Sequence, residues 1–156
     1  MRRHALLALL AGFVVAGAGL WAADDPQSTA VKQEMKKLEG TWRVAAMERD
    51  GQKVPEADFK DLQATVRGNS YTQKKGTETV EKGTFQIDTT HKPHWITITP
   101  TQGEDKGKKM LGIYEAEGKD TIRMCGAAPG KERPTDFSAK ADSGRTLMTY
   151  KRVESK

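Results

Sequence analysis

Cysteine, histidine and aromatic residues are all scarce in this chain of 156 residues. It has one cysteine, Cys125, three histidines, and 6% Phe, Trp and Tyr together. A single cysteine cannot form an internal disulfide, so packing must hold the fold even in an oxidising compartment. His91 and His94 flank Pro93, but no further Cys or His cluster supplies the three or four ligands that a useful metal site requires. We expect a solvated turn there, no metal and no cofactor.

Long apolar runs are also absent, apart from one at the N-terminus. A basic start, Met1–His4, precedes 16 uncharged residues, Ala5–Leu20, and small residues then lead to Asp24. This layout is typical of a secretory signal peptide, whereas a membrane span needs about 20 residues. We therefore expect residues 1–23 to be removed by cleavage after Ala22 or Ala23, with an uncleaved membrane anchor as the alternative. The mature protein is then exported, periplasmic or secreted, and has no stable membrane span.

The charge is only mildly unbalanced. The full chain has 26 basic and 21 acidic residues, and loss of Arg2 and Arg3 leaves 24 against 21. This excess is too small and too dispersed to predict a nucleic-acid partner. No phosphate-binding glycine loop, nucleophile elbow or Ser/His/Asp pattern is present, so we expect no enzymatic activity. About 133 residues remain after cleavage, which is enough for one domain with one core.

The hydrophobic pattern changes along the mature chain. Residues 24–30 are polar and predict a linker, whereas Val31–Leu38 has apolar residues at helical spacing and predicts a short amphipathic helix. Trp42–Met47 then alternates with a period of two, and Asp50-Gly51 predicts a turn behind it. Pro55–Leu62 is the one later segment that predicts a helix, with its proline at a permitted first position.

Seven further segments carry strand patterns with Gly, Asn or Ser turns between them. They are Gln63–Arg67, Ser70–Lys75, Glu78–Asp88, His94–Thr99, Lys109–Glu115, Thr121–Cys125 and Thr146–Arg152. Their sparing apolar content is typical of antiparallel sheets that bury one face. Closing eight strands into a barrel removes exposed edges without disulfides. The sequence thus predicts an all-β protein, an eight-stranded antiparallel up-and-down barrel formed as a single domain by residues 31–156.

A set of short motifs recurs in a recognisable order. They are Leu38-Glu39-Gly40-Thr41-Trp42 with Asp50-Gly51 behind it, Lys92-Pro93-His94-Trp95-Ile96-Thr97-Ile98, Gly112-Ile113-Tyr114-Glu115, Ile122-Arg123-Met124-Cys125, Arg133-Pro134-Thr135-Asp136-Phe137 and Ser143-Gly144-Arg145-Thr146-Leu147. Together they resemble a small lipocalin-like domain family found expanded in planctomycete bacteria, which has no agreed activity. The resemblance implies a lipocalin-like barrel in which Arg152 packs over Trp42 near the closed end, with a gain of about 0.5–2 kcal/mol.

A barrel of this size either encloses one small ligand or is filled by side chains. We expect a lining of apolar residues that face inward: Val44, Phe85, Ile96, Ile98, Ile113 and Met124. Binding of a small apolar ligand by a monomer is the first hypothesis. The alternative is a non-enzymatic domain with a filled barrel that binds a protein or the cell envelope, which an exposed apolar patch would favour.

Two further residues raise the question of a site. Cys125 ends a predicted strand, and because free cysteine is among the most buried residue types, a structural role is expected. Arg133 lies in the segment Arg133–Phe137, where it could hold an anionic ligand at the barrel mouth. It could instead tie its loop to a carboxylate, with Phe137 buried beneath, and we favour this structural interpretation.

Overall fold

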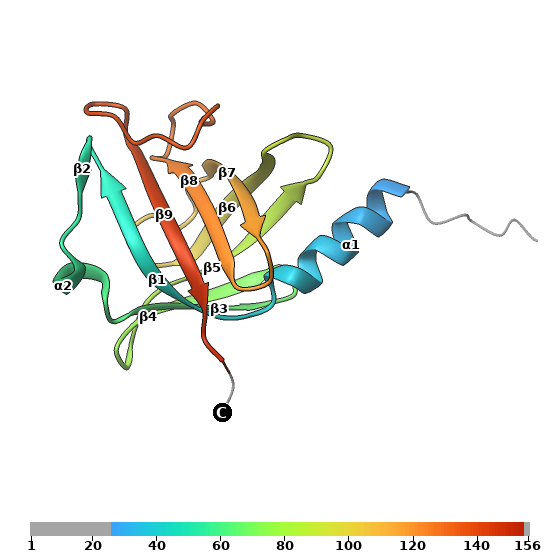
Figure 1. Cartoon of the computed structure of the whole chain (residues 1–156), viewed down its shortest axis with the longest axis horizontal. Coiled ribbons are helices and arrows are strands. Elements are labelled where there is room, and N and C mark those ends of the chain that lie inside the picture. Colours follow the sequence, from blue (N-terminus) through green and yellow to red (C-terminus); the bar gives the residue numbers. More distant parts are fainter. Residues whose placement is uncertain (1–25, 155–156) are drawn as a thin grey trace, which may run out of the picture.

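The computed structural model describes residues 26–154, so the expected signal peptide lies outside the described residues. Two short helices and nine strands follow one another along the chain (Figure 1). They are α1 Pro26–Leu38, β1 Gly40–Arg49, β2 Gln52–Lys53, α2 Glu56–Phe59, β3 Leu62–Arg67, β4 Ser70–Lys75, β5 Glu78–Asp88, β6 His94–Gln102, β7 Met110–Glu117, β8 Thr121–Ala127 and β9 Arg145–Arg152. None of the helices among these residues has the length and apolarity needed to cross a membrane.

The strands form one closed antiparallel barrel, which confirms the predicted fold class. From β3 to β9 each strand pairs with the next in sequence, and β1 joins β3 on one side and β9 on the other. The closing pair runs from Trp42 opposite Arg152 to Arg49 opposite Thr146. Eight strands make this lipocalin-like barrel, and β2 is an extra two-residue strand that pairs with the end of β1. Closure leaves no edge that would template aggregation.

The helices differ from the expectation in their bounds. α1 starts at Pro26 and not at Val31, so most of the predicted polar linker is helical. The reason is that proline is tolerated in a first helical turn and residues 27–30 carry no helix breaker, although they lack the apolar spacing that signals a helix. α2 is a single turn, Glu56–Phe59, closed by a hydrogen bond from Lys60 N to Glu56 O of 2.8 Å.

The turn after β1 is the one that the sequence predicts. Asp50 and Gly51 have φ values of 54° and 75°. Two consecutive left-handed residues make the type I′ hairpin turn that matches the twist of paired strands, which explains the Asp-Gly pair. This hairpin joins β1 to β2, and the register opposes Arg49 to Gln52.

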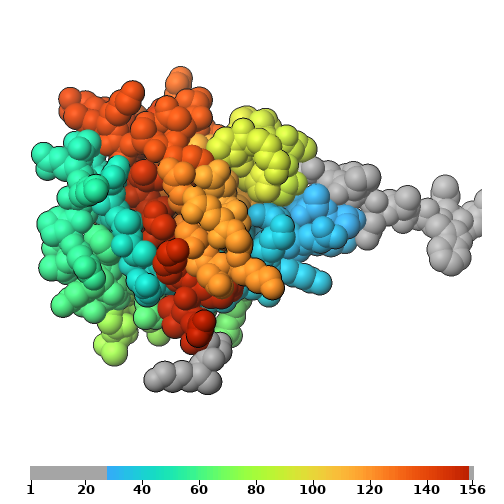
Figure 2. Space-filling model, in the orientation of Figure 1, coloured from blue at the N-terminus to red at the C-terminus, as the bar shows by residue number. Residues whose placement is uncertain are grey.

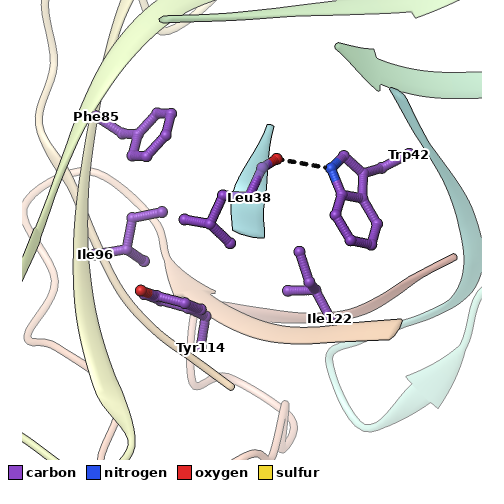
Figure 3. Packing of buried hydrophobic residues seen from close by; sticks show 6 residues of the cluster. All are labelled: Leu38, Trp42, Phe85, Ile96, Tyr114 and Ile122. Atoms are coloured by element: carbon purple, nitrogen blue, oxygen red, sulfur yellow. Dashed lines mark hydrogen bonds between the residues drawn. The ribbon is translucent and has the colours of Figure 1, made fainter. Parts of the chain in front are cut away.

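α1 closes one end of the barrel. Its last residue, Leu38, is buried in a cluster formed by Trp42, Phe85, Ile96, Tyr114 and Ile122 (Figure 3). Trp42 also donates a hydrogen bond of 2.9 Å from Nε1 to the Leu38 carbonyl oxygen. A tryptophan N–H in a core needs such a partner. The indole therefore both packs against the helix end and fixes its position.

A long connection between β8 and β9, which we call the strap (residues 128–144), covers part of the outer barrel surface near the other end. Figure 2 shows it, in orange to red, along the upper edge of the molecule. The strap reaches the β1–β2 turn through a 2.5 Å hydrogen bond from Gly51 N to Ala139 O. Pro134 and Ala139 of the strap are themselves buried. The strap therefore gives the outside of the barrel a small apolar layer of its own.

Candidate ligand cavity

The barrel contains a half-open cavity of about 580 Å³. Leu38 and Trp42 line it at the end closed by α1. Its rim at the other end is formed by the β1–β2 turn, the β6–β7 connection and the two ends of the strap, with Asp50, Asp105 and Pro129 among the lining residues. Pockets that hold small molecules span about 300–1,000 Å³ and are mostly apolar. The cavity has the size and the lining of such a pocket.

Four of the six residues expected to line the interior do so. Phe85, Ile96, Ile98 and Met124 all face the cavity. Val44 is 2% exposed and lies opposite Tyr150, yet it does not reach the cavity wall.

The expectation for Ile113 is wrong. Its neighbour Tyr114 faces inward, and because side chains alternate along a strand, Ile113 points outward. It lies opposite Trp95 on β6 and Cys125 on β8. It is nevertheless 1% exposed. Because the strap buries this outward-facing position, the residue there is as apolar as one that faces inward.

Several lining residues were missed, and β9 shows what signal could have found them. Met148 and Tyr150 lie two residues apart in this strand and both face the cavity. Met148 stands opposite Met124, which was expected to line it. The alternation Leu147-Met148-Thr149-Tyr150 carries this information, but a leucine on the outer face makes the choice of face ambiguous from sequence.

Polar groups in the wall gather around Glu81. The Tyr71 hydroxyl donates a hydrogen bond of 2.6 Å to Glu81 Oε1. The Tyr150 hydroxyl donates to the Met148 sulfur at 3.2 Å, which is a weak acceptor. Burial, and after it the negative charge of Glu81, raise the pKa of both tyrosines far above the ordinary value. Both phenols therefore remain protonated, and they donate to Glu81 and to the Met148 sulfur.

Gly83 determines where Tyr71 lies. The two residues face each other across β4 and β5. A Cβ atom on Gly83 would lie 2.7 Å from the Tyr71 ring and 2.6 Å from the Thr99 carbonyl oxygen. Any side chain at this position would displace the phenol, so the glycine allows the ring to lie flat on the strand and reach Glu81.

Deeper in the barrel, the Tyr114 hydroxyl has no partner. Tyr114 is 1% exposed, and its oxygen is the buried side-chain polar atom without a hydrogen bond among residues 26–154. Its hydroxyl points to the Ile96 side of the cluster in Figure 3. An unsatisfied buried polar group costs about 1–3 kcal/mol.

His94 does not lie in a solvated turn as expected. Its side chain is 14% exposed, and its Nδ1 lies 3.6 Å from Glu34 Oε1 on α1. The ring also packs edge-on against Tyr114, with centroids 5.4 Å apart. Burial, followed by the nearby charge of Lys92, lowers the pKa of His94. This histidine thus joins α1 to the start of β6.

The other histidine of the pair has a different neighbour. His91 stacks on Trp95 with centroids 3.5 Å apart. In the part of the chain that the structure describes, no three His, Cys, Asp or Glu residues are grouped so that they could hold a metal ion. The two imidazoles thus pack against different rings, His91 on Trp95 and His94 on Tyr114.

Arg152 lies over Trp42, as the resemblance implied. The guanidinium carbon is 4.1 Å from the ring centroid. Its nitrogens also donate to three carbonyl oxygens, those of Lys37, Glu39 and Lys119, at 2.9, 2.7 and 3.0 Å. The last strand is thereby tied to the end of α1, on the outside of the closed end.

Arg133 is structural, but its partners differ from those expected. One nitrogen donates to the carbonyl oxygens of Ile96 and Gly112, both at 2.6 Å, and the other to Thr97 Oγ1 at 3.0 Å. The guanidinium also lies 4.7 Å from the Trp95 ring centroid. Among residues 26–154 no carboxylate forms an ion pair with Arg133, and Phe137 instead lies against Arg123. Arg133 thus pins the strap to the outer face of β6 and β7.

Cys125 lies on the same outer face and is fully buried under the strap. Its sulfur is 3.5 Å from the Ser138 carbonyl oxygen. Burial raises the pKa of the thiol, although Arg145 acts in the opposite direction. A buried thiol with a raised pKa is a poor nucleophile, which agrees with a structural role.

Comparisons with protein-family models, with curated proteins and with solved structures found no match to this chain.

Proposed function

We propose that this protein is a non-enzymatic lipocalin-like domain that binds a small, mainly apolar molecule inside the barrel. The single observation that carries the proposal is the cavity of about 580 Å³ between α1 and the rim. Its wall is built from residues such as Phe85, Ile96 and Met124, which offer apolar contact area to a ligand. Burying apolar surface there is worth about 25 cal/mol per Å².

The alternative, an interaction domain with a filled barrel, has less support. Among the described residues the large apolar side chains that are exposed are Val80 and Trp95, at 36% and 37%. Trp95 is flanked by His91 and Arg133 and presents no wide apolar face. Contiguous apolar patches of several hundred Å² are what mark protein or membrane contacts. Ligand binding is therefore the function that we propose.

The test is a binding titration with the neutral apolar fluorophore N-phenyl-1-naphthylamine. Ile98→Trp adds volume at the cavity wall and should weaken binding by about tenfold or more, because overpacked cores resist extra volume. Thr84→Trp is the matched control, since Thr84 is exposed on β5 and does not line the cavity. It should leave binding unchanged.

Circular dichroism of each variant shows that the barrel is intact. A wild-type protein that does not bind the fluorophore would contradict the proposal. So would an Ile98→Trp protein that binds it as well as the Thr84→Trp protein does.

We also propose that the domain is exported and works as a monomer. Export rests on the basic start at Met1–His4 and the apolar run at Ala5–Leu20. We likewise propose that the chain belongs to the lipocalin-like family that its motifs resemble. Mass spectrometry of the protein recovered from a bacterial periplasm would reveal whether it begins after Ala22 or Ala23.

A further inference from the structure

The cavity differs in charge from the rest of the chain. The full sequence carries a net charge of +5. The wall and rim of the cavity have the opposite balance, with four carboxylates against two guanidiniums: Glu81, Asp50, Glu104 and Asp105 against Arg49 and Arg145. The cavity wall and rim thus hold more acidic than basic side chains, whereas the chain as a whole is basic.

The positive groups at the rim are already engaged. Arg145 lies 3.3 Å from Asp136 on the strap, and Arg49 donates to Thr146 Oγ1 at 3.3 Å. On the acidic side Asp105 is paired with Lys108 at 3.1 Å. Asp50 and Glu104 have no ion pair among the described residues, but Arg49 keeps its charge and Lys106 and Lys109 lie in the same connection as Glu104, so the charges of the rim largely cancel.

Glu81 lies further inside than the other three. It belongs to β5 and faces Gln73 across the sheet, on the inner side that Phe85 also faces, whereas the other acids lie in turns. Tyr71 donates to Oε1 alone. Within residues 26–154 no lysine, arginine or histidine forms an ion pair with Glu81. The second oxygen is therefore open to a donor that enters the cavity.

We infer that the bound molecule is an amphiphile with a protonated amine beside its apolar body, and that Glu81 receives the amine; this rests on the proposed function. A charge-assisted hydrogen bond between N⁺–H and a carboxylate is shorter and stronger than a neutral one. The surrounding apolar wall strengthens it, because the local dielectric is lower than that of water. An anionic amphiphile in the same place would face an uncompensated like charge.

The experiment compares three ligands with one tail: decylamine, decanol and decanoate, each displacing N-phenyl-1-naphthylamine below its micelle concentration. The wild-type protein should bind decylamine about tenfold or more tightly than decanoate. Glu81→Gln keeps the shape and an oxygen that accepts from Tyr71, and should remove most of this difference. Glu78→Gln removes the same charge from an exposed position of β5 that does not line the cavity, and should retain the difference. Decanol should bind all three proteins alike.

The outcomes separate this inference from the proposed function. If the fluorophore binds but decylamine and decanoate compete equally, the inference fails and the proposed function stands. If Glu81→Gln keeps the full preference for decylamine, Glu81 is not the residue that receives the amine. If the wild-type protein does not bind the fluorophore, the proposed function itself fails.

Discussion

Arg152 links three parts of the chain through one side chain. It covers the Trp42 ring and donates to carbonyl oxygens at the end of α1 and in the turn after β7. Gly40 makes room for it, because a Cβ atom there would lie 2.7 Å from a guanidinium nitrogen. Gly40 also has a φ of 123°, which other residues rarely adopt. The Gly-x-Trp motif is thus explained by an arginine more than a hundred residues away.

At this scale we predict an energetic coupling between Trp42 and Arg152. Trp42→Ala should lower the free energy of unfolding by about 3–5 kcal/mol because it empties the core. In a double-mutant cycle with Arg152→Ala, the coupling should be about 0.5–2 kcal/mol, from the cation–π contact. Urea unfolding of the four proteins measures it.

Lys151→Ala is the control for this cycle. Its side chain donates to Thr121 and does not contact the Trp42 ring. Coupled with Trp42→Ala it should show strictly additive losses. Additive losses for Arg152→Ala as well would mean that the arginine stabilises the chain through its carbonyl partners alone.

At the scale of elements, the strap explains why Ile113 and Cys125 are buried on the outer face of β7 and β8. Arg133 fastens it to β6 and β7, and Cys125 is sealed beneath it. A planar guanidinium that meets two carbonyls and a hydroxyl cannot be replaced by a lysine without loss of geometry. The reactivity of the buried thiol therefore reports on whether the strap is closed.

We predict that Arg133→Ala exposes Cys125. Its reaction with 5,5′-dithiobis(2-nitrobenzoate) should become about tenfold faster than in the wild-type protein, because local opening is easier by about 1.4 kcal/mol. Arg133→Lys should restore little of the protection. Glu132→Ala, an exposed neighbour in the strap, is the control and should react like the wild-type protein.

A global loss of stability would also speed the reaction, so urea unfolding of each variant is measured in parallel. If the thiol of Arg133→Ala reacts at the wild-type rate, the strap is held by its other contacts. One such contact is the hydrogen bond between Gly51 and Ala139.

At the scale of the whole molecule, the barrel depends on a pairing between the two ends of the domain. β1 and β9 are separated by most of the chain, yet their register runs through seven residue pairs. Contacts between segments so distant in sequence form late in folding, because closing the long loop between them costs conformational entropy. The last strand therefore decides whether the sheet closes.

We predict that a chain ending at Gly144 does not form the barrel, because β1 and β8 both lose a partner and expose their edges. It should show no cooperative thermal unfolding and should aggregate in size-exclusion chromatography. A chain ending at Val153 keeps β9 and the hydrogen bond from Val153 N to Thr41 O, and should unfold like the full protein. A cooperative transition in the shorter chain would show that closure is dispensable.

The sequence by itself determined the strands, the Asp50-Gly51 turn and the barrel architecture. These follow from local signals: the period of two, the turn residues and the spacing between them. β4 and β5 have the bounds that the pattern predicts, Ser70–Lys75 and Glu78–Asp88. These local patterns can be read from the sequence because each strand must bury one face, whichever strands lie beside it.

Only the tertiary structure decided which face points inward and what surrounds it. Ile113 and Tyr114 are adjacent and equally buried, but the register turns Tyr114 into the cavity and the strap covers Ile113 outside. Glu81 becomes part of a cavity wall only when β5 closes against β4 and β6. Inside and outside are properties of pairing and closure between distant segments, and no local pattern of residues carries them.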